Sequence, residues 1–122
     1  LLKSTKERVQ ADRFNAVKEL VRMWGGACLL KGSGSLTCSN ERPKTIYLCS
    51  EGNAGMATGG MGDVLSGLIA SLIAQGLTLR DALNCGICIH GQAGDLASVA
   101  SGERGLLATD LFAYLRPLLN PV

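Results

Sequence analysis

A run of glycines directly before an apolar stretch is the part of the sequence best suited to do chemistry. Gly59, Gly60 and Gly62 lie in the glycine-rich segment 51–67, just where a helix is expected to begin. Glycine lets the backbone turn several N–H groups toward one point. The free N–H groups and the dipole of the following helix would face the same point. The spacing therefore predicts that these three glycines form an anion hole suited to a phosphate.

One carboxylate, Asp63, follows the predicted anion hole. An acidic residue in the first turn of a helix is ordinarily a cap. Beside a phosphate site it could instead accept the proton of a hydroxyl that attacks phosphorus. The segment is neither a Walker A loop nor a G-x-G-x-x-G loop after a strand. A glycine-rich turn with Asp63 as its cap remains the structural alternative.

A second candidate site is the small, basic segment Lys31-Gly32-Ser33-Gly34-Ser35, which follows an apolar run. Ligands in open α/β sheets gather at the carboxyl ends of strands. Small residues there would admit a phosphate or a ribose, and Lys31 adds positive charge. A plain turn between two strands fits the same residues equally well.

The apolar pattern predicts one helix, then three strands, then three helices. The first helix would run to Trp24 from a cap at Ser4, with Glu7 closing a capping box. The expected strands are 27–30, 36–39 and 45–49. The later helices would run from Gly62 or Asp63 to about 75, from 79 to about 100 after a cap at Thr78, and to about 119 after a cap at Thr109. Strands buried beside helices indicate the α/β class.

Charge and hydropathy exclude some classes of protein. The chain of 122 residues has twelve basic and ten acidic side chains, for a net charge of +2. That balance gives no basic footprint for nucleic acid or an anionic membrane. The longest apolar stretch, 64–74, is shorter than the roughly 20 residues that cross a bilayer. We therefore expect a soluble, cytoplasmic protein.

The cysteines and the single histidine are interpreted as structural. The five cysteines are an odd number in an aliphatic sequence, which favours a reducing compartment over a disulfide scaffold. Cys85 and Cys88, with His90 nearby, could form a redox dithiol or a metal site. Their place in an apolar helical run favours core packing instead. The charges of the first helix, Asp12 and Arg13 among them, are interpreted as a solvated face.

Taken together, the motifs resemble one family. Leu30 to Gly34, the segment 52–67, the segment 90–95 and the segment 102–111 resemble the ADP-dependent NAD(P)H-hydrate dehydratases. These enzymes form the carboxyl-terminal domain of bifunctional NAD(P)HX repair proteins. Ala54 departs from the pattern, since the family often has proline there. The resemblance covers nearly the whole chain.

The resemblance implies a ribokinase-like fold and a repair reaction. Hydrated NADH or NADPH would be dehydrated at the expense of ADP, which leaves AMP and phosphate, with Mg²⁺ expected to neutralise the phosphates. Lys31 to Ser35 and Gly62 match the nucleotide-binding positions, and Asp63 matches the residue at the hydrated nicotinamide. Gly59, Gly60 and Gly62 would hold the transferred phosphoryl group.

The resemblance also implies that residues 1–122 are the carboxyl-terminal portion of a single domain. The family's domain is longer at its amino end, and a fused epimerase domain precedes it in some members. A homo-oligomer is expected. Two other functions stay open: a ribokinase-like kinase for a small alcohol such as a vitamin precursor, and a non-catalytic fragment that binds nucleotide.

Overall fold

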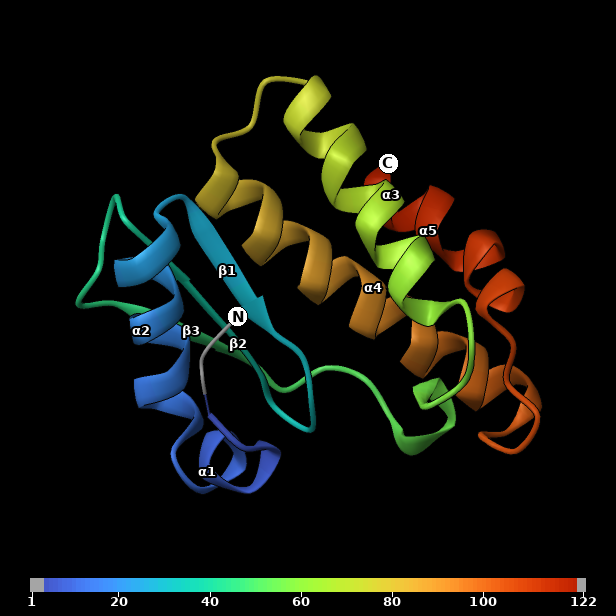
Figure 1. The fold of residues 1–122 in the computed structure, drawn as a ribbon. Helices are drawn as coiled ribbons and strands as arrows, with labels where there is room; N and C mark the ends of the chain where they lie inside the picture. Colours follow the sequence, from blue (N-terminus) through green and yellow to red (C-terminus); the bar gives the residue numbers. More distant parts are fainter. Residues whose placement is uncertain (1–3, 121–122) are drawn as a thin grey trace.

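A small antiparallel sheet lies between helices that cover both of its faces (Figure 1). The computed structural model describes residues 4–120. The strands β1 (Ala27–Leu30), β2 (Ser35–Ser39) and β3 (Ile46–Cys49) are paired in that order. The central strand β2 is buried at every position, because helices pack on both sides of it.

The helices form two layers around this sheet. On one face lies α2 (Arg13–Trp24), preceded by the short α1 (Lys6–Ala11). On the other face lies the long α4 (Leu79–Ser101), and α3 (Met61–Ala74) and α5 (Phe112–Leu119) pack on α4. Two 3₁₀ turns, η1 (Ala54–Met56) and η2 (Ala108–Leu111), lie in the connecting segments. None of the helices within residues 4–120 is long and apolar enough to span a bilayer.

Three apolar clusters hold the layers together. Val17 and Val21 of α2 pack on Leu36 and Cys38 of β2. On the opposite face, Cys49 of β3 packs with Leu65 of α3 and Ile87 of α4. The largest cluster lies among the helices, with these buried members: Met61, Leu68, Leu72, Ala82, Ala93, Ala97, Leu106, Leu111 and Leu115. Because α4 contacts both the sheet and the helices, it connects the two halves of the molecule (Figure 1).

The strands and the two central helices follow the sequence prediction closely. The strand 27–30 is confirmed to the residue, and the other two differ by one residue at their first position. Thr78 caps α4 as expected, with its hydroxyl accepting from the Asp81 N–H at 3.2 Å. Helix α3 begins at Met61, one or two residues before the expected start at Gly62 or Asp63, because Gly60 takes the N-cap position.

The first and last helices were predicted wrongly at their starts. The first is two helices, because Asp12 leaves the helical conformation and its carboxylate accepts from the Asn15 N–H at 2.9 Å to cap α2. Thr5, not Ser4, caps α1. Near the end of the chain, Asp110 rather than Thr109 holds the turn, by accepting from the Leu107 N–H at 2.8 Å.

The prediction that Cys85 and Cys88 pack in the core is also wrong. Cys85 and Cys88 are both exposed, three residues apart on one side of α4. The buried side of this helix carries Leu83, Ile87 and His90 instead. An apolar run in a long helix does not by itself say which side faces the core.

Candidate functional site

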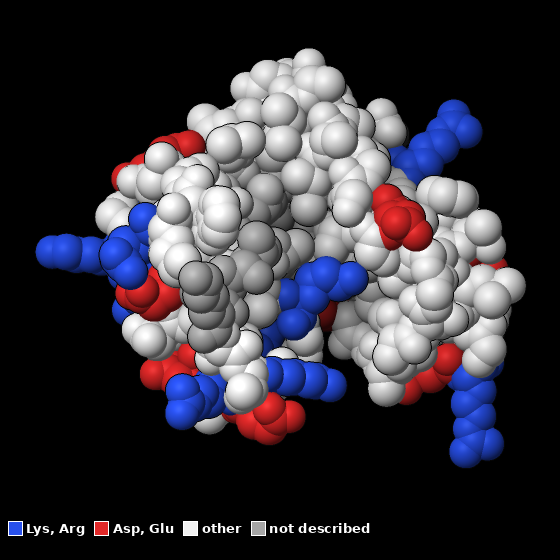
Figure 2. Space-filling view, viewed as in Figure 1, with Lys and Arg blue, Asp and Glu red and all other residues white. Residues whose placement is uncertain are grey.

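A cavity of about 620 Å³ opens between the sheet and the helices. Its wall comes from four places: the β1–β2 loop at 31–35, the glycine-rich segment 51–58, the start of α3 at 61–65 and the α4 segment 87–91. The space-filling view shows the surface hollowed between the two halves of the molecule, with basic side chains at its edge (Figure 2). The two motifs that the sequence singled out separately thus face one space.

The two motifs meet at Lys31 and Gly62. A Cβ built on Gly62 would lie 2.9 Å from the Lys31 Nζ, so the ammonium group rests against the first turn of α3. The absence of a side chain at Gly62 gives Lys31 this room. A lysine charge and the positive end of a helix dipole are therefore directed at the same region, which is an arrangement that attracts an anion.

The first turn of α3 leaves backbone donors free for such an anion. Gly60 has φ +85°, a left-handed conformation that favours glycine, and a Cβ there would lie 3.2 Å from the Ala108 Cβ. Its carbonyl accepts from the N–H groups of Asp63 and Val64, each at 3.0 Å. Within the described residues, 4–120, no side chain caps this end of α3. The earlier N–H groups of Met61 and Gly62 precede the first possible bond within the helix.

The structure brings most of the predicted nucleotide-binding residues to the cavity. Its described wall includes Lys31, Gly32, Ser33, Ser35 and Gly62. The remaining candidates, Gly34, Gly59, Gly60 and Asp63, lie beside this wall rather than on it.

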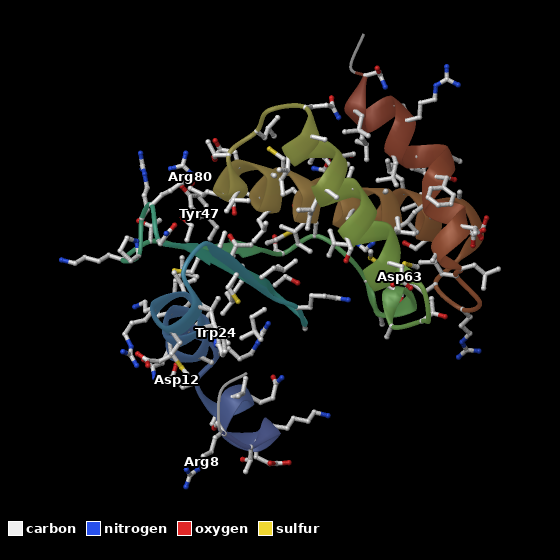
Figure 3. All side chains as sticks on the ribbon, turned by 45° about the horizontal axis from the view of Figure 1, so that its top comes forward. Arg8, Asp12, Trp24, Tyr47, Asp63 and Arg80 are labelled. Carbon is white, nitrogen blue, oxygen red and sulfur yellow. The ribbon has the colours of Figure 1, made fainter. Side chains whose placement is uncertain are left out.

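Asp63 occupies the first turn of α3, as the sequence suggested. Figure 3 shows it at the end of α3 nearest the glycine-rich loop, and its side chain is exposed. Within residues 4–120, no side-chain hydrogen bond or ion pair involves the Asp63 carboxylate. A group that is to accept a proton needs such an unoccupied carboxylate.

A residue that sequence reasoning missed holds the Lys31 loop. The Arg13 guanidinium donates to the Ser33 carbonyl at 2.9 Å and to the Leu30 carbonyl at 3.1 Å. The loop is closed from inside by Ser35, whose hydroxyl donates to the Gly32 carbonyl at 3.2 Å. The charged neighbours of Arg13 suggested that it lies on a solvated face. That interpretation is wrong for Arg13, which binds the Lys31 loop. Arg13 is directed at the loop because α2 begins directly after the cap residue Asp12. The charged run around Asp12 gave no sign of this cap.

His90 is a buried member of the same cavity wall. Its side chain is 4% exposed, and its Nε2 lies 3.0 Å from the Met61 carbonyl oxygen. A carbonyl oxygen only accepts, so Nε2 carries the proton and donates. Burial lowers the pKa of His90, and the nearby Lys31 charge acts in the same direction, against the opposing effect of the Met61 bond. His90 is thus a neutral residue that supports the first turn of α3, consistent with the structural interpretation.

The lowered pKa of His90 predicts how stability changes with pH. Below the ordinary histidine value of 6.5 the unfolded chain takes up a proton that the folded chain resists, so stability falls as pH decreases. Because His90 is the only histidine, the loss between pH 7 and pH 5.5 should shrink in His90→Gln. Urea midpoints at the two pH values measure it. An equal loss in both proteins would assign the effect to other groups.

The described residues do not form a dedicated metal centre. Within residues 4–120, no group of three or more His, Cys, Asp or Glu side chains could hold a metal ion. The acidic residue on the described cavity wall is Glu51. Mg²⁺ is commonly held by one or two carboxylates together with substrate phosphates and water. The site fits Mg²⁺ only in that manner.

Comparison with known proteins gives one family. A family model described as NAD(P)H-hydrate dehydratase matches residues 1–117. The bifunctional NAD(P)H-hydrate repair enzyme Nnr of Coxiella burnetii is 50% identical over 121 residues, which cover 99% of this chain and 24% of that protein. The ADP-dependent (S)-NAD(P)H-hydrate dehydratase of Neisseria meningitidis is 41% identical, over all of this chain and 41% of that protein. The chain thus spans less than half of the length of either relative.

Solved structures show the same fold. Bacillus subtilis YxkO superposes with a TM-score of 0.89 at 23% identity, over 98% of this chain and 44% of that one. The Bacillus subtilis ADP/ATP-dependent NAD(P)H-hydrate dehydratase, co-crystallized with ATP/Mg²⁺, gives a TM-score of 0.83 at 24% identity, over 91% and 39%. The predicted ribokinase-like α/β fold is confirmed. With a family model that matches residues 1–117 and a relative that is 50% identical over 121 residues, this chain belongs to the NAD(P)H-hydrate dehydratase family.

Proposed function

We propose that this chain carries the nucleotide-binding and phosphoryl-transfer part of an ADP-dependent NAD(P)H-hydrate dehydratase. The observation that carries the proposal is the meeting of Lys31 with the first turn of α3 at the wall of one cavity. Phosphoryl transfer depends mainly on positioning and on stabilising charge, and this arrangement supplies both. Membership of the family supports hydrated NADH or NADPH and ADP as the proposed substrates.

The proposed reaction has two steps. Asp63 accepts the proton of the C6 hydroxyl as that oxygen attacks the β-phosphorus of ADP, and AMP leaves. The phosphate ester then breaks at its C–O bond, because the ring nitrogen supplies electrons and phosphate is a better leaving group than hydroxide. Loss of a proton from C5 of the resulting iminium ion to water restores the C5–C6 double bond. The sum is hydrated NADH plus ADP giving NADH, AMP and phosphate. Gly59, Gly60 and Gly62 would stabilise the transferred group through backbone N–H groups, and Mg²⁺ near Glu51 would neutralise phosphate charge.

The assay follows NADH absorbance after hydrated NADH and ADP are mixed with the chain. A second arm uses a chimera in which this chain replaces the matching 41% of the Neisseria meningitidis protein. Recovery of NADH that requires ADP is the expected result in the chimera. A stable phosphorylated substrate would instead indicate a small-alcohol kinase. Nucleotide binding without turnover in both arms would indicate a non-catalytic chain.

Lys31 offers a direct test of the anion site. Lys31→Met keeps much of the apolar stem and removes the charge, so we expect ADP to bind roughly 10- to 150-fold more weakly, as for the loss of a hydrogen bond to a charged group worth about 1.5–3 kcal/mol. Lys44→Met, in the β2–β3 turn and outside the cavity wall, is the matched control. Isothermal titration measures both. Equal weakening in the two variants would contradict a local role for Lys31.

Other features of the proposal rest on the sequence and the relatives. The cytoplasm is the proposed location, in keeping with five unpaired cysteines. Residues 1–122 are proposed to be the carboxyl-terminal portion of one domain, because the relatives are longer. The names of several relatives include "bifunctional", which fits a fused epimerase in such proteins. A homo-oligomer remains a prediction, as does the absence of nucleic-acid and membrane partners.

A further inference from the structure

The glycine-rich segment is anchored at its start by an acidic residue of α4 that the proposed chemistry does not use. The Asp95 Oδ2 accepts from the Gly52 N–H at 2.9 Å, and the Asp95 Oδ1 accepts from the Asn53 Nδ2 at 3.0 Å. Both carboxylate oxygens are thus occupied by the same two-residue segment. The contact joins parts of the chain that are 42 and 43 residues apart.

Asn53 extends this contact into the loop. While its Nδ2 donates to Asp95, its Oδ1 accepts from the Gly55 N–H at 3.1 Å and caps η1. The orientation of the Asn53 amide is therefore fixed at both ends. Because Asn53, Ala54 and Met56 all belong to the cavity wall, the position of η1 determines the shape of that wall.

Two glycines on the surface of α4, Gly91 and Gly94, allow the loop to approach the helix near Asp95. A Cβ on Gly91 would lie 2.6 Å from the Glu51 Cβ and 2.9 Å from the Glu51 carbonyl carbon. A Cβ on Gly94 would overlap the side chain of Met56, including a contact of 2.9 Å with Cγ. The two glycines therefore let the loop lie directly on the helix.

We propose that Asp95 is a positioning residue for the phosphate site, which acts by holding Gly52 and Asn53 so that the loop has its ligand-binding shape before ADP arrives. The inference rests on the proposed function. Asp95 lies outside the described cavity wall, so its effect on ADP passes through these two residues. A loop held in its bound shape binds more tightly, because the observed dissociation constant rises as the competent fraction falls.

The first test is Asp95→Asn. Its carboxamide has one oxygen and one NH₂ group, so a donor must face either the Gly52 N–H or the Asn53 NH₂. We expect amide exchange to accelerate at Gly52 and Gly55, and the dissociation constant of ADP to rise about tenfold, as when the competent loop fraction falls to a tenth. Exchange is measured by NMR and binding by titration, under conditions where every variant is folded.

The second test exchanges the two side chains in Asn53→Asp with Asp95→Asn. In this double variant the new amide at 95 donates to the new carboxylate at 53, which still accepts from the Gly55 N–H. The amide oxygen at 95 still accepts from Gly52. The dissociation constant of ADP should return to within about twofold of that of the original chain. Asn53→Asp alone places two carboxylates face to face, so it should bind ADP more weakly than the original chain and the double variant.

A stability control separates positioning from general destabilisation. Val21→Ala removes buried methyl groups in the α2 cluster, away from the cavity wall. It should lower the unfolding midpoint without changing ADP binding. Unchanged ADP binding in Asp95→Asn, or failure of the double exchange to restore it, would overturn the inference. If the original chain binds no ADP, the proposed function fails. The anchoring of the loop is tested separately, because unaltered amide exchange at Gly52 and Gly55 in Asp95→Asn would refute it.

Discussion

Asp63→Asn is expected to abolish the ADP-dependent recovery of NADH almost entirely, with kcat lower by about 10²- to 10⁴-fold. The asparagine side chain has nearly the same shape but cannot take a proton from the attacking hydroxyl. Because Asp63 is exposed and belongs to the first turn of α3, its removal should cost only about 0.3–1 kcal/mol of interaction with the helix dipole. Loss of activity would thus come from loss of the base.

The matched control for this substitution is Asp81→Asn. Asp81 is also an acidic residue in the first turn of a helix, α4, but it pairs with Arg80. The first turn of α4 contributes nothing to the described cavity wall, whereas Gly62, next to Asp63, belongs to that wall. We expect Asp81→Asn to leave turnover unchanged, measured in whichever protein is active, that is, the chain alone or the chimera. ADP binding to Asp63→Asn should stay close to that of the original protein. Turnover near the original rate in Asp63→Asn would exclude Asp63 as the general base.

Two glycine-to-alanine changes should move stability in opposite directions. Gly91 packs against Glu51, and a Cβ there would lie 2.9 Å from its carbonyl carbon and 3.0 Å from its oxygen. Backbone atoms cannot swing aside as a flexible side chain does, so Gly91→Ala should cost about 1–3 kcal/mol through overpacking. Gly67, within α3, has no heavy atom of residues 4–120 within 4 Å of the position that a Cβ would take. Gly67→Ala should instead stabilise the protein by about 1 kcal/mol.

Urea denaturation of both variants measures this difference. The midpoint should fall for Gly91→Ala and rise for Gly67→Ala, with the slope of the transition unchanged if the denatured state is unaltered. Gly91→Ala should also weaken ADP binding, because the start of the loop is displaced from α4. An increase in stability for Gly91→Ala would show that α4 does not lie against Glu51 in solution.

Local patterns predicted the parts of the fold that are decided locally. The apolar run 27–30 became β1 without adjustment, and the hydroxyl of Thr78 caps α4. The glycines at 60 and 62 indicated the start of α3 to within two residues, and no side chain within residues 4–120 caps that end of the helix. Each of these features depends on residues within a few positions, which is the range that periodicity and capping rules describe.

The features that were missed depend on distant or competing contacts. Asp12 was hidden in a charged run, and its role as the cap of α2 is what directs Arg13 to the Lys31 loop. The partner of His90 is the Met61 carbonyl, 29 residues away, and a sequence does not reveal such a pairing. Cys85 and Cys88 belong to an apolar run, but the side of α4 that faces the sheet is set by tertiary packing.

The contacts that hold the proposed site differ from those of the sheet in the length of chain that they enclose. Strands β1, β2 and β3 pair with their neighbours in the sequence, so this sheet closes only short loops. The Met61–His90 and Gly52–Asp95 contacts close segments of 29 and 43 residues. Such closure is slow and becomes favourable only late in folding. A peptide shorter than the segment from Lys31 to Asp95 would lack part of this framework, and a nascent chain acquires the site only after α4 has been synthesised.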